Sequence, residues 1–501
     1  MRAGQEQLIQ RYEDALARQK TEFESRIGEL RAEMTVMEEK LRHQRSDFDA
    51  EVGQVEQERE TRVTELEKLL KEDERLGGWM AMEAKDGRGV GVALRNLWQE
   101  FPKALAVEKG VLRVKLWPDD GPAMSFLPEA IMPKSFYYAE EWKRYAFSKD
   151  VGHYVHEYEY AKNPYFLYTA EGSSKTHEMV VYFYDQTSKR RMGEVNSVTQ
   201  HPVVVRQDPK LAMRVPFMGF DVMPVNREKY PEIERAAEQL GRMAVGRWPS
   251  LHDYGYFRFG MMRWGTPGEM LYRWMDGMQY DQQLIPWLLF IRGGNRFFYE
   301  EGENTARFAM DLATNHFNTR GYPTGYEAPA GPMPFPWLPA HIGKHMKIHF
   351  LAYYYHLTGY ERAREVMQEV IEGTKTVATE ENPRWGMGEG RETYNMNVFW
   401  VNAYEETGDP EIKDLARQWL DHTMNTQYSP DLNSFTYPGN NLFNGLVLQD
   451  GLWKDARLKA IMLKNLDGKG YPRLRDGGIW NLDDAVACQW AFRETKDERY
   501  V

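Results

Sequence analysis

Two stretches decide the fold: residues 355–373 read YHLTGYERAREVMQEVIEG, and residues 404–422 read YEETGDPEIKDLARQWLDH. In each, a helix end is followed by a glycine, and a second helix with apolar residues every three or four positions begins directly afterwards. Glycine readily takes the left-handed conformation that ends an α-helix, so each stretch predicts a helical hairpin. The same pattern occurs at residues 290–311, and a fourth copy, which lacks the glycine, begins at residues 491–501.

This internal repeat predicts that residues 207–501 form an α/α toroid. Stacked hairpins leave their loops on one face, where a groove can form. In the last copy the chain ends where the second helix should begin, so we expect a toroid that is clipped at its C-terminus.

The N-terminal part of the chain has a different period. From Gln5 to about Leu70 it is rich in Glu, Gln, Arg and Lys, and its sparse apolar residues follow alternating steps of three and four, as in a heptad repeat. A helix this polar buries too little surface alone, which implies a partner helix. We therefore predict a coiled-coil stalk over residues 1–76 that makes the protein a homo-oligomer. The alternatives are a solvated single helix or an artefact of gene fusion.

The pattern changes at Gly77 and Gly78, after which aromatic and β-branched residues alternate with polar ones. Strands are expected at residues 90–98, 110–117, 153–161 and 176–185. Turn signals between them favour an antiparallel β-sandwich over residues 78–206. The fold class predicted for the whole chain is multidomain α+β: an N-terminal coiled-coil helix, a β-sandwich and an α/α toroid.

Composition limits the classes of partner. The net charge of -11 repels nucleic acid. The sequence also contains no run of about 18 uncharged apolar residues, so no membrane span is predicted. The N-terminus as written has no apolar segment of the secretory type, so the localisation stays open between the cytoplasm and export through a leader not present here. Aromatic residues make up 13% of the chain, which suits either stacking on sugars or large helical cores.

Chemistry-bearing residues concentrate around one loop. Five of the 12 histidines lie between His316 and His356, and the loop at residues 318–339 is rich in glycine, proline and aromatic residues. Long loops between helices are more often functional than idle. The side chains at its edges offer bases, a cation and a stacking ring, and they are Asn315, His316, Arg320, Tyr322, Tyr326, Trp337, His341 and His345.

Such a set suits β-elimination on a uronic acid, in which a cation offsets the carboxylate, a base removes the C5 proton and an acid protonates the leaving oxygen. Later in the chain, Arg391, Tyr394 and Asn395 open a helix beside a glycine-rich loop, and arginine clamps carboxylates with two parallel hydrogen bonds. The predicted catalytic residues are His316, His341, Tyr322, Tyr326 and Arg391. The predicted substrate-binding residues are Asn315, Arg320, Trp337, His345, Tyr394 and Asn395.

The same residues leave two other chemistries open. Glycoside hydrolysis needs two carboxylates that face each other, and the candidates are Asp276, Asp281, Asp311 and Glu327. A zinc site is suggested by the spacing of His341, His345 and His349, but Ile342 stands where an HExxH motif would have its glutamate. We therefore expect no metal, and elimination requires no cofactor.

Seven segments between residues 95 and 409 occur in the order RNLWQEFPKAL, LRVKLWP, GSSKTHEMVVYF, YDQQLIPWLLFIRGGNRFF, DLATNHFN, HIGKHMKIHFLAYYYHLTG and GRETYNMNVFWVNAYEETGD. In this order they resemble exo-acting rhamnogalacturonan lyases and their bacterial relatives, polysaccharide lyase family 26, and the resemblance covers about residues 78–501. The resemblance implies an N-terminal barrel, a central β-sandwich and a C-terminal toroid that holds the active-site cleft. It matches the family's histidine-bearing hairpin and later arginine motif to Asp311, His316, His341, His345 and Arg391.

This sequence departs from the family in two places. The heptad stalk stands where the barrel is expected, and the turn at residues 292–295 reads Arg-Gly-Gly-Asn in place of the family's Arg-Thr-Gly-Asp. The predicted function is a polysaccharide lyase that cleaves an acidic, rhamnogalacturonan-like polysaccharide or oligosaccharide. The alternatives are a glycoside hydrolase on the same scaffold and a non-catalytic oligomeric carbohydrate-binding protein.

Overall fold

The computed structural model describes residues 61–64, 77–119, 121, 172–186, 192–206, 208–212, 222–245, 254–256, 259–262, 282–317, 326–327, 347–377, 390–435, 442–470 and 482–500. They belong to two compact units. The first unit comprises Met1–Pro122 and His177–Val203, and the second comprises Ala123–Thr176 and Val204–Val501. None of the described helices combines the length and the apolar run that crossing a bilayer requires.

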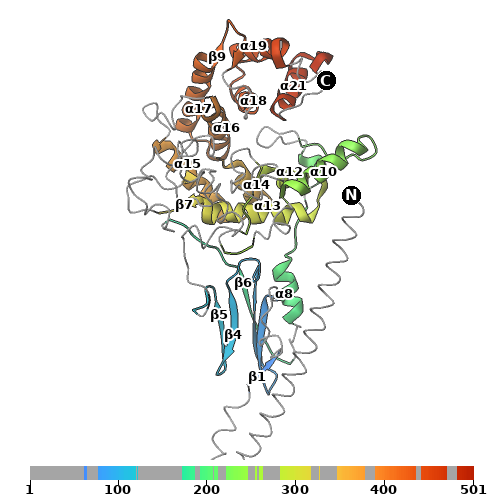
Figure 1. The fold of residues 1–501 in the computed structure, drawn as a ribbon, viewed down its shortest axis with the longest axis vertical. Coiled ribbons are helices and arrows are strands. Elements are labelled where there is room, and N and C mark those ends of the chain that lie inside the picture. The colour runs from blue at the N-terminus through green and yellow to red at the C-terminus, as the bar shows by residue number, and fades with distance from the viewer. Residues whose placement is uncertain are drawn as a thin grey trace, which may run out of the picture. The chain divides into compact units, whose positions relative to one another are not determined.

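The first unit contains an antiparallel four-stranded sheet in the order β1 (Thr61–Thr64), β2 (Trp79–Ala84), β3 (Gly89–Leu94) and β6 (Met179–Tyr184). Strands β4 (Ala104–Glu108) and β5 (Val111–Lys115) pair as a separate hairpin (Figure 1). Helix α8 (Met192–Gln200) packs on the sheet, where the Gln200 amide donates to the Leu94 carbonyl at 3.0 Å. A Cβ atom on Gly91 would lie 2.3 Å from Met192 Sδ, so glycine allows this close approach.

Strands β3, β5 and β6 confirm three of the predicted strand segments, and the segment at residues 153–161 lies outside the described residues. The described strands form one sheet and one hairpin, so the two-sheet sandwich stays a prediction. The continuous helix predicted for the stalk is wrong at Thr61–Thr64, which pairs with β2. This TRVT segment is rich in β-branched residues, which favour strands. The rest of the predicted coiled coil lies outside the described residues.

The second unit confirms the predicted array of helical hairpins in the described residues. Its hairpins are α12 (Leu284–Gly293) with α13 (Arg296–Phe308), α14 (His349–Thr358) with α15 (Glu361–Val377), α16 (Gly390–Thr407) with α17 (Pro410–His422), and α18 (Leu442–Trp453) with α19 (Ala456–Asn465). Helix α21 (Leu482–Thr495) follows them and ends in a 3-10 turn at Glu498–Tyr500. Neighbouring helices α16, α18 and α21 lie side by side (Figure 1).

The two helices of a hairpin differ in how they are buried. Helix α18 buries every residue from Leu442 to Asp450, so it is surrounded by protein. Helix α17 buries one stripe, formed by Ile412, Ala416, Trp419 and Leu420, and presents its other side to water. The first helices of the hairpins are therefore an inner layer and the second helices an outer layer, as an α/α toroid requires.

Each inner helix turns into its outer partner, or into the final 3-10 turn, at a two-residue corner. The first corner residue is left-handed in all five copies, namely Gly294, Gly359, Gly408, Lys454 and Lys496. Its N–H donates to the carbonyl four residues earlier, as from Gly359 to Tyr355 at 2.6 Å. The second corner residue often caps the next helix, since the Asp455 carboxylate accepts from the N–H groups of Arg457 and Leu458.

The connections from outer to inner helices are longer. Helices α13, α17 and α19 end in π-helical turns at Ala309–Ala313, Thr423–Gln427 and Leu466–Gly470. Two of these turns lead into short strand pairs, β7 (Thr314–Asn315) with β8 (Tyr326–Glu327) and β9 (Tyr428–Ser429) with β10 (Ser434–Phe435). Corners and long connections therefore lie at opposite ends of the hairpins.

Candidate functional site

The long connections and the first turns of the inner helices form one end of the helical unit. We call it the loop face and define it by β7 to β10, residues 316–317, and the first two turns of α14, α16 and α18 with Lys347 and Ile348 before α14. Inner helices run parallel to one another, because each begins after a long connection and ends at a corner. Their N-termini, which carry partial positive charge, are therefore all at the loop face.

A buried cation lies at this face. Lys347 precedes α14 and is 1% exposed, and its Nζ donates to Oδ1 of Asn395 in the second turn of α16. His349, in the first turn of α14, is also buried. Burying an ammonium group is unfavourable unless hydrogen bonds or charges compensate it. A lysine kept inside at the start of an apolar helix is therefore a candidate functional residue.

Two residues after Asn395, Asn397 belongs to a set of buried amides that connect three elements. The Asn397 amide donates to Thr423 Oγ1 at 2.7 Å and accepts from Gln449 Nε2 at 3.0 Å. Gln449 Nε2 also donates to the Ala416 carbonyl at 2.9 Å. These side chains are buried, and they fix α16 against α18 and the π-turn after α17. The network holds the inner helix that carries Asn395 in one position.

His316 follows β7 and is held at both ring nitrogens. Nδ1 lies 2.8 Å from Glu369 Oε2, and Nε2 lies 2.5 Å from the Met310 carbonyl oxygen. Both partners accept hydrogen bonds, so both nitrogens are arranged to donate. For His316 to accept a proton from a substrate, one of these two contacts has to open.

The backbone next to His316 is anchored by a segment from earlier in the chain. The Gly172 carbonyl accepts from the His316 N–H at 2.8 Å. The Asp311 carboxylate accepts from the Thr176 N–H at 2.7 Å and from its hydroxyl at 2.8 Å. Asp311 is buried, and Thr176 engages both of its oxygens, so this carboxylate stabilises the segment at residues 172–176.

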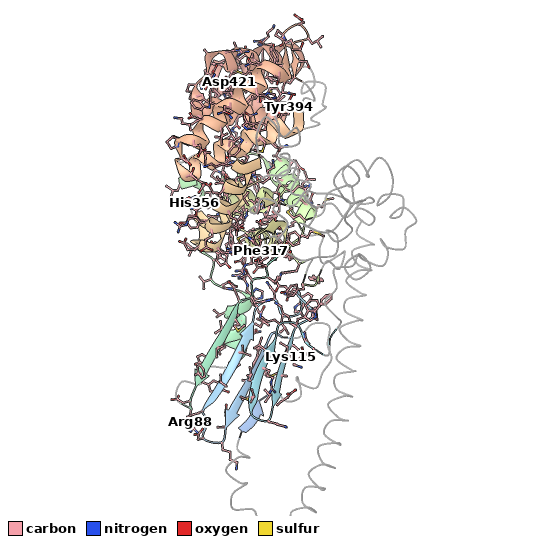
Figure 2. All side chains as sticks on the ribbon, turned by 90° about the vertical axis from the view of Figure 1, so that its left-hand side faces the viewer. Arg88, Lys115, Phe317, His356, Tyr394 and Asp421 are labelled. Atoms are coloured by element: carbon pink, nitrogen blue, oxygen red, sulfur yellow. The ribbon has the colours of Figure 1, made fainter. Side chains whose placement is uncertain are left out.

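Phe317, next to His316, is an exposed ring that the sequence reasoning missed. It exposes 60% of its surface (Figure 2). A flat, accessible ring at this position suits stacking on the apolar face of a sugar. The signal in the sequence is an aromatic residue directly beside a histidine at the edge of the predicted functional loop.

The other predicted residues have different placements. The β7–β8 pair sets Asn315 opposite Tyr326, and Arg391 lies in the first turn of α16. Tyr394 and Asn395 are buried, so in this structure they pack inside the helical unit. The residues Arg320, Tyr322, Trp337, His341 and His345 lie outside the described part of the chain.

The described segments that carry predicted residues therefore lie at the loop face. These residues are Asn315, His316, Tyr326, Arg391, Tyr394 and Asn395. Lys347 and Phe317 are additions that sequence reasoning did not include, and His349 entered it only as a candidate zinc ligand. Among the described residues, no three His, Cys, Asp or Glu side chains are grouped so as to hold a metal ion.

No known protein family and no curated protein sequence matches this chain. Among the solved structures that are similar to it are two cellobiose 2-epimerases. The one from Bacillus thermoamylovorans B4167 has 13% sequence identity and a TM-score of 0.39, and the match covers 53% of this chain and 84% of that one. The one from Spirochaeta thermophila DSM 6192 has 13% sequence identity and a TM-score of 0.35, and the match covers 55% of this chain and 84% of that one. At TM-scores below 0.5 this likeness assigns no activity or substrate.

Proposed function

We propose that this protein is a carbohydrate-active enzyme of the α/α toroid class, and that it is a polysaccharide lyase whose substrate contains uronic acid. The observation that carries the proposal is the buried Lys347 at the loop face, beside Asn395 and among the N-termini of the inner helices. Lysine and helix N-termini both favour an anionic ligand. The whole chain has a net charge of -11, so this local preference for an anion does not come from the overall composition.

The same charges suit the elimination reaction. In β-elimination, removal of the C5 proton builds negative charge on the uronate carboxylate before the C4–O bond breaks and the C4–C5 double bond forms. A fixed cation near the carboxylate stabilises that charge in a site from which water is largely excluded. In this proposal Lys347 supplies part of the field, and Arg391 or Arg320 binds the carboxylate directly.

The remaining roles follow the sequence hypothesis. His316 or Tyr326 takes the C5 proton, and His341 or Tyr322 protonates the leaving oxygen. For His316, this role requires release from Glu369 or from the Met310 carbonyl, a movement that substrate binding would have to drive. Phe317 joins Trp337 as a ring on which a sugar can stack.

Incubation with pectic rhamnogalacturonan tests the proposal. The expected product is an unsaturated sugar, which is detected by the ultraviolet absorbance of its new double bond. Lys347→Met should lower the rate roughly 100-fold, the usual effect of losing one electrostatic contributor to a transition state. Lys464→Met, at an exposed position on α19, should leave the rate unchanged.

Unfolding curves of both variants establish that they are folded. Release of reducing sugar without an ultraviolet signal would identify a hydrolase instead. Binding of the polysaccharide without either product would identify a non-catalytic binding protein.

A further inference from the structure

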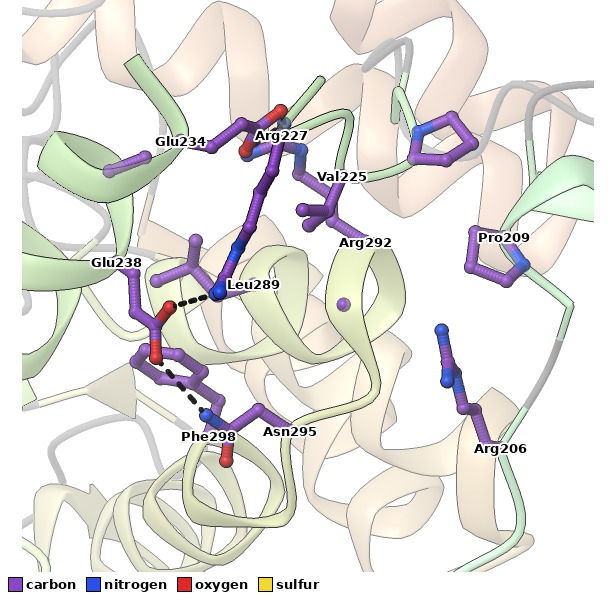
Figure 3. Close-up of a pocket in the computed structure, with 13 residues that line it drawn as sticks. Arg206, Pro209, Val225, Arg227, Glu234, Glu238, Leu289, Arg292, Asn295 and Phe298 are labelled. Atoms are coloured by element: carbon purple, nitrogen blue, oxygen red, sulfur yellow. Dashed lines mark hydrogen bonds and ion pairs between the residues drawn. The ribbon is translucent and has the colours of Figure 1, made fainter. Parts of the chain in front are cut away.

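The helical unit has a cavity of about 370 Å³ at the corner end of α12 (Figure 3). Its walls come from Arg206 and Pro209, the segment before α10 (Pro231–Val245), α10 itself, α12 and the start of α13. Helix α12 has 10 residues, so roughly 15 Å separates this cavity from the loop-face end of the same helix. The volume lies within the range of small-molecule sites, towards its lower end.

The cavity has an excess of positive charge. Arg292 donates to both oxygens of Glu234, at 2.7 and 2.9 Å, and both side chains are largely buried. Glu238 is shared by Arg227 and Arg242, with distances of 2.5 and 3.0 Å. The two acids are thus already neutralised by arginines from within the unit. Any further cation at this cavity adds net positive charge.

Arg206 is that further cation. It lines the cavity, and among the described residues it has no acidic partner (Figure 3). Its side chain lies across the corner, because a Cβ atom on Gly294 would be 2.2 Å from Arg206 Nε. Gly294 also has a φ of 67°, so glycine is favoured there by its backbone and by the arginine that covers it.

The rest of the lining is divided into polar and apolar parts. Asn295 and Glu238 lie together, with Asn295 Nδ2 3.5 Å from Glu238 Oε1. Phe298, Leu289 and Val225 supply apolar surface. A wall with hydrogen-bonding groups beside an apolar wall matches a sugar ring, which has hydroxyl groups at its edge and C–H groups on its faces.

We propose that this cavity binds a single uronic acid residue, with Arg206 as the ligand of the carboxylate. The planar guanidinium presents two parallel N–H groups to the two carboxylate oxygens. Glu238 and Asn295 hydrogen-bond the sugar hydroxyls, and the apolar wall covers one face of the ring. The choice of uronic acid rests on the proposed function; the site is separate from the loop face and gives the same acidic polymer a second point of attachment.

Calorimetric titration of the full chain with galacturonic acid tests this proposal. Arg206→Gln should weaken binding at least tenfold, because it removes a charge-assisted pair. The matched control Arg235→Gln, on an exposed side of α10, should change the affinity less than twofold. Galactose, which lacks the carboxylate, should bind at least tenfold more weakly than galacturonic acid.

Three results would overturn the proposal: equal affinity for galactose and galacturonic acid, unchanged binding by Arg206→Gln, or equally tight binding of inorganic phosphate. Titration of Lys347→Met separates this site from the loop face, because cavity binding should persist in that variant. If the protein cleaves the polymer but does not bind galacturonic acid, only the cavity proposal is refuted. If it binds galacturonic acid through Arg206 but does not cleave the polymer, only the lyase proposal is refuted.

Discussion

The left-handed corner residues allow one prediction to be worked out in detail. Gly359 has a φ of 70°, and no atom lies within 4 Å of the Cβ that alanine would add. Gly359→Ala therefore meets no clash, and its only penalty is the left-handed backbone, roughly 1–2 kcal/mol. Alanine also restricts the unfolded chain, which returns roughly 0.4–1 kcal/mol. The expected net loss is about 1 kcal/mol in the free energy of unfolding.

Gly451 provides a matched control. It lies in α18, its added Cβ also meets nothing within 4 Å, and its φ is not positive. Gly451→Ala should therefore stabilise the protein by roughly 0.5–1 kcal/mol, because glycine is unfavourable in a helix. The same chemical change is expected to have opposite signs at the two positions.

Lys454 offers the reverse experiment. It occupies the equivalent corner with a φ of 50°, so Lys454→Gly should relieve the strain and stabilise by roughly 0.5 kcal/mol. Lys454 Nζ lies 4.0 Å from Asp450 Oδ2. Because the lysine side chain is 71% exposed, this ion pair contributes little to the free energy of unfolding. Urea unfolding monitored by helical circular dichroism measures all three variants. A shift of Gly359→Ala and Gly451→Ala in the same direction would refute the reasoning about the corners.

Three further predictions concern the buried groups of the helical unit. Asn397→Ala leaves Thr423 and Gln449 without their shared partner, so urea unfolding should show a loss of about 2–4 kcal/mol. Burial of Glu301, with Glu300 nearby, raises its pKa from 4.5 to about 8, so its contribution to stability is present below pH 4.5 and is lost as the pH rises through 8. Glu301→Gln should therefore raise the melting temperature at pH 8.5 and leave it unchanged near pH 4; a uniform shift would contradict this. Gly445→Ala places a Cβ 2.9 Å from a backbone oxygen of α16, and calorimetry should show a loss of about 1–3 kcal/mol despite the better helix former.

Sequence reasoning identified the three hairpins in which glycine occupies the corner, and the start of a further copy at residues 491–501, where Lys496 takes that position. It missed the α18–α19 hairpin, where Lys454 stands at the corner in place of glycine. The signal that remains is the aspartate that follows, since Asp409 and Asp455 both cap the next helix. A cap depends on a few local hydrogen bonds, so it persists where the glycine is absent.

The buried polar residues of the loop face were harder to predict. Lys347, Asn397 and Gln449 stand in inner helices or next to them, where the surrounding sequence is apolar and has no period that separates a buried from an exposed side. Their partners come from residues 26 to 52 positions away, so only tertiary packing determines the contacts. The strand at Thr61–Thr64 was missed for a similar reason, because its pairing with β2 overrides the helical character of its neighbours.

The two-residue corners and the longer outer-to-inner connections should differ in how well they tolerate insertions and deletions during evolution. A two-residue corner cannot gain or lose a residue without displacing the helices it joins, whereas the β9–β10 turn at residues 430–433 is exposed or half-buried and does not join helices directly. Insertions and deletions in descendants of this sequence should therefore gather at the loop face. A library built to give this scaffold a new ligand preference is best varied in length at that turn, with the corners left intact.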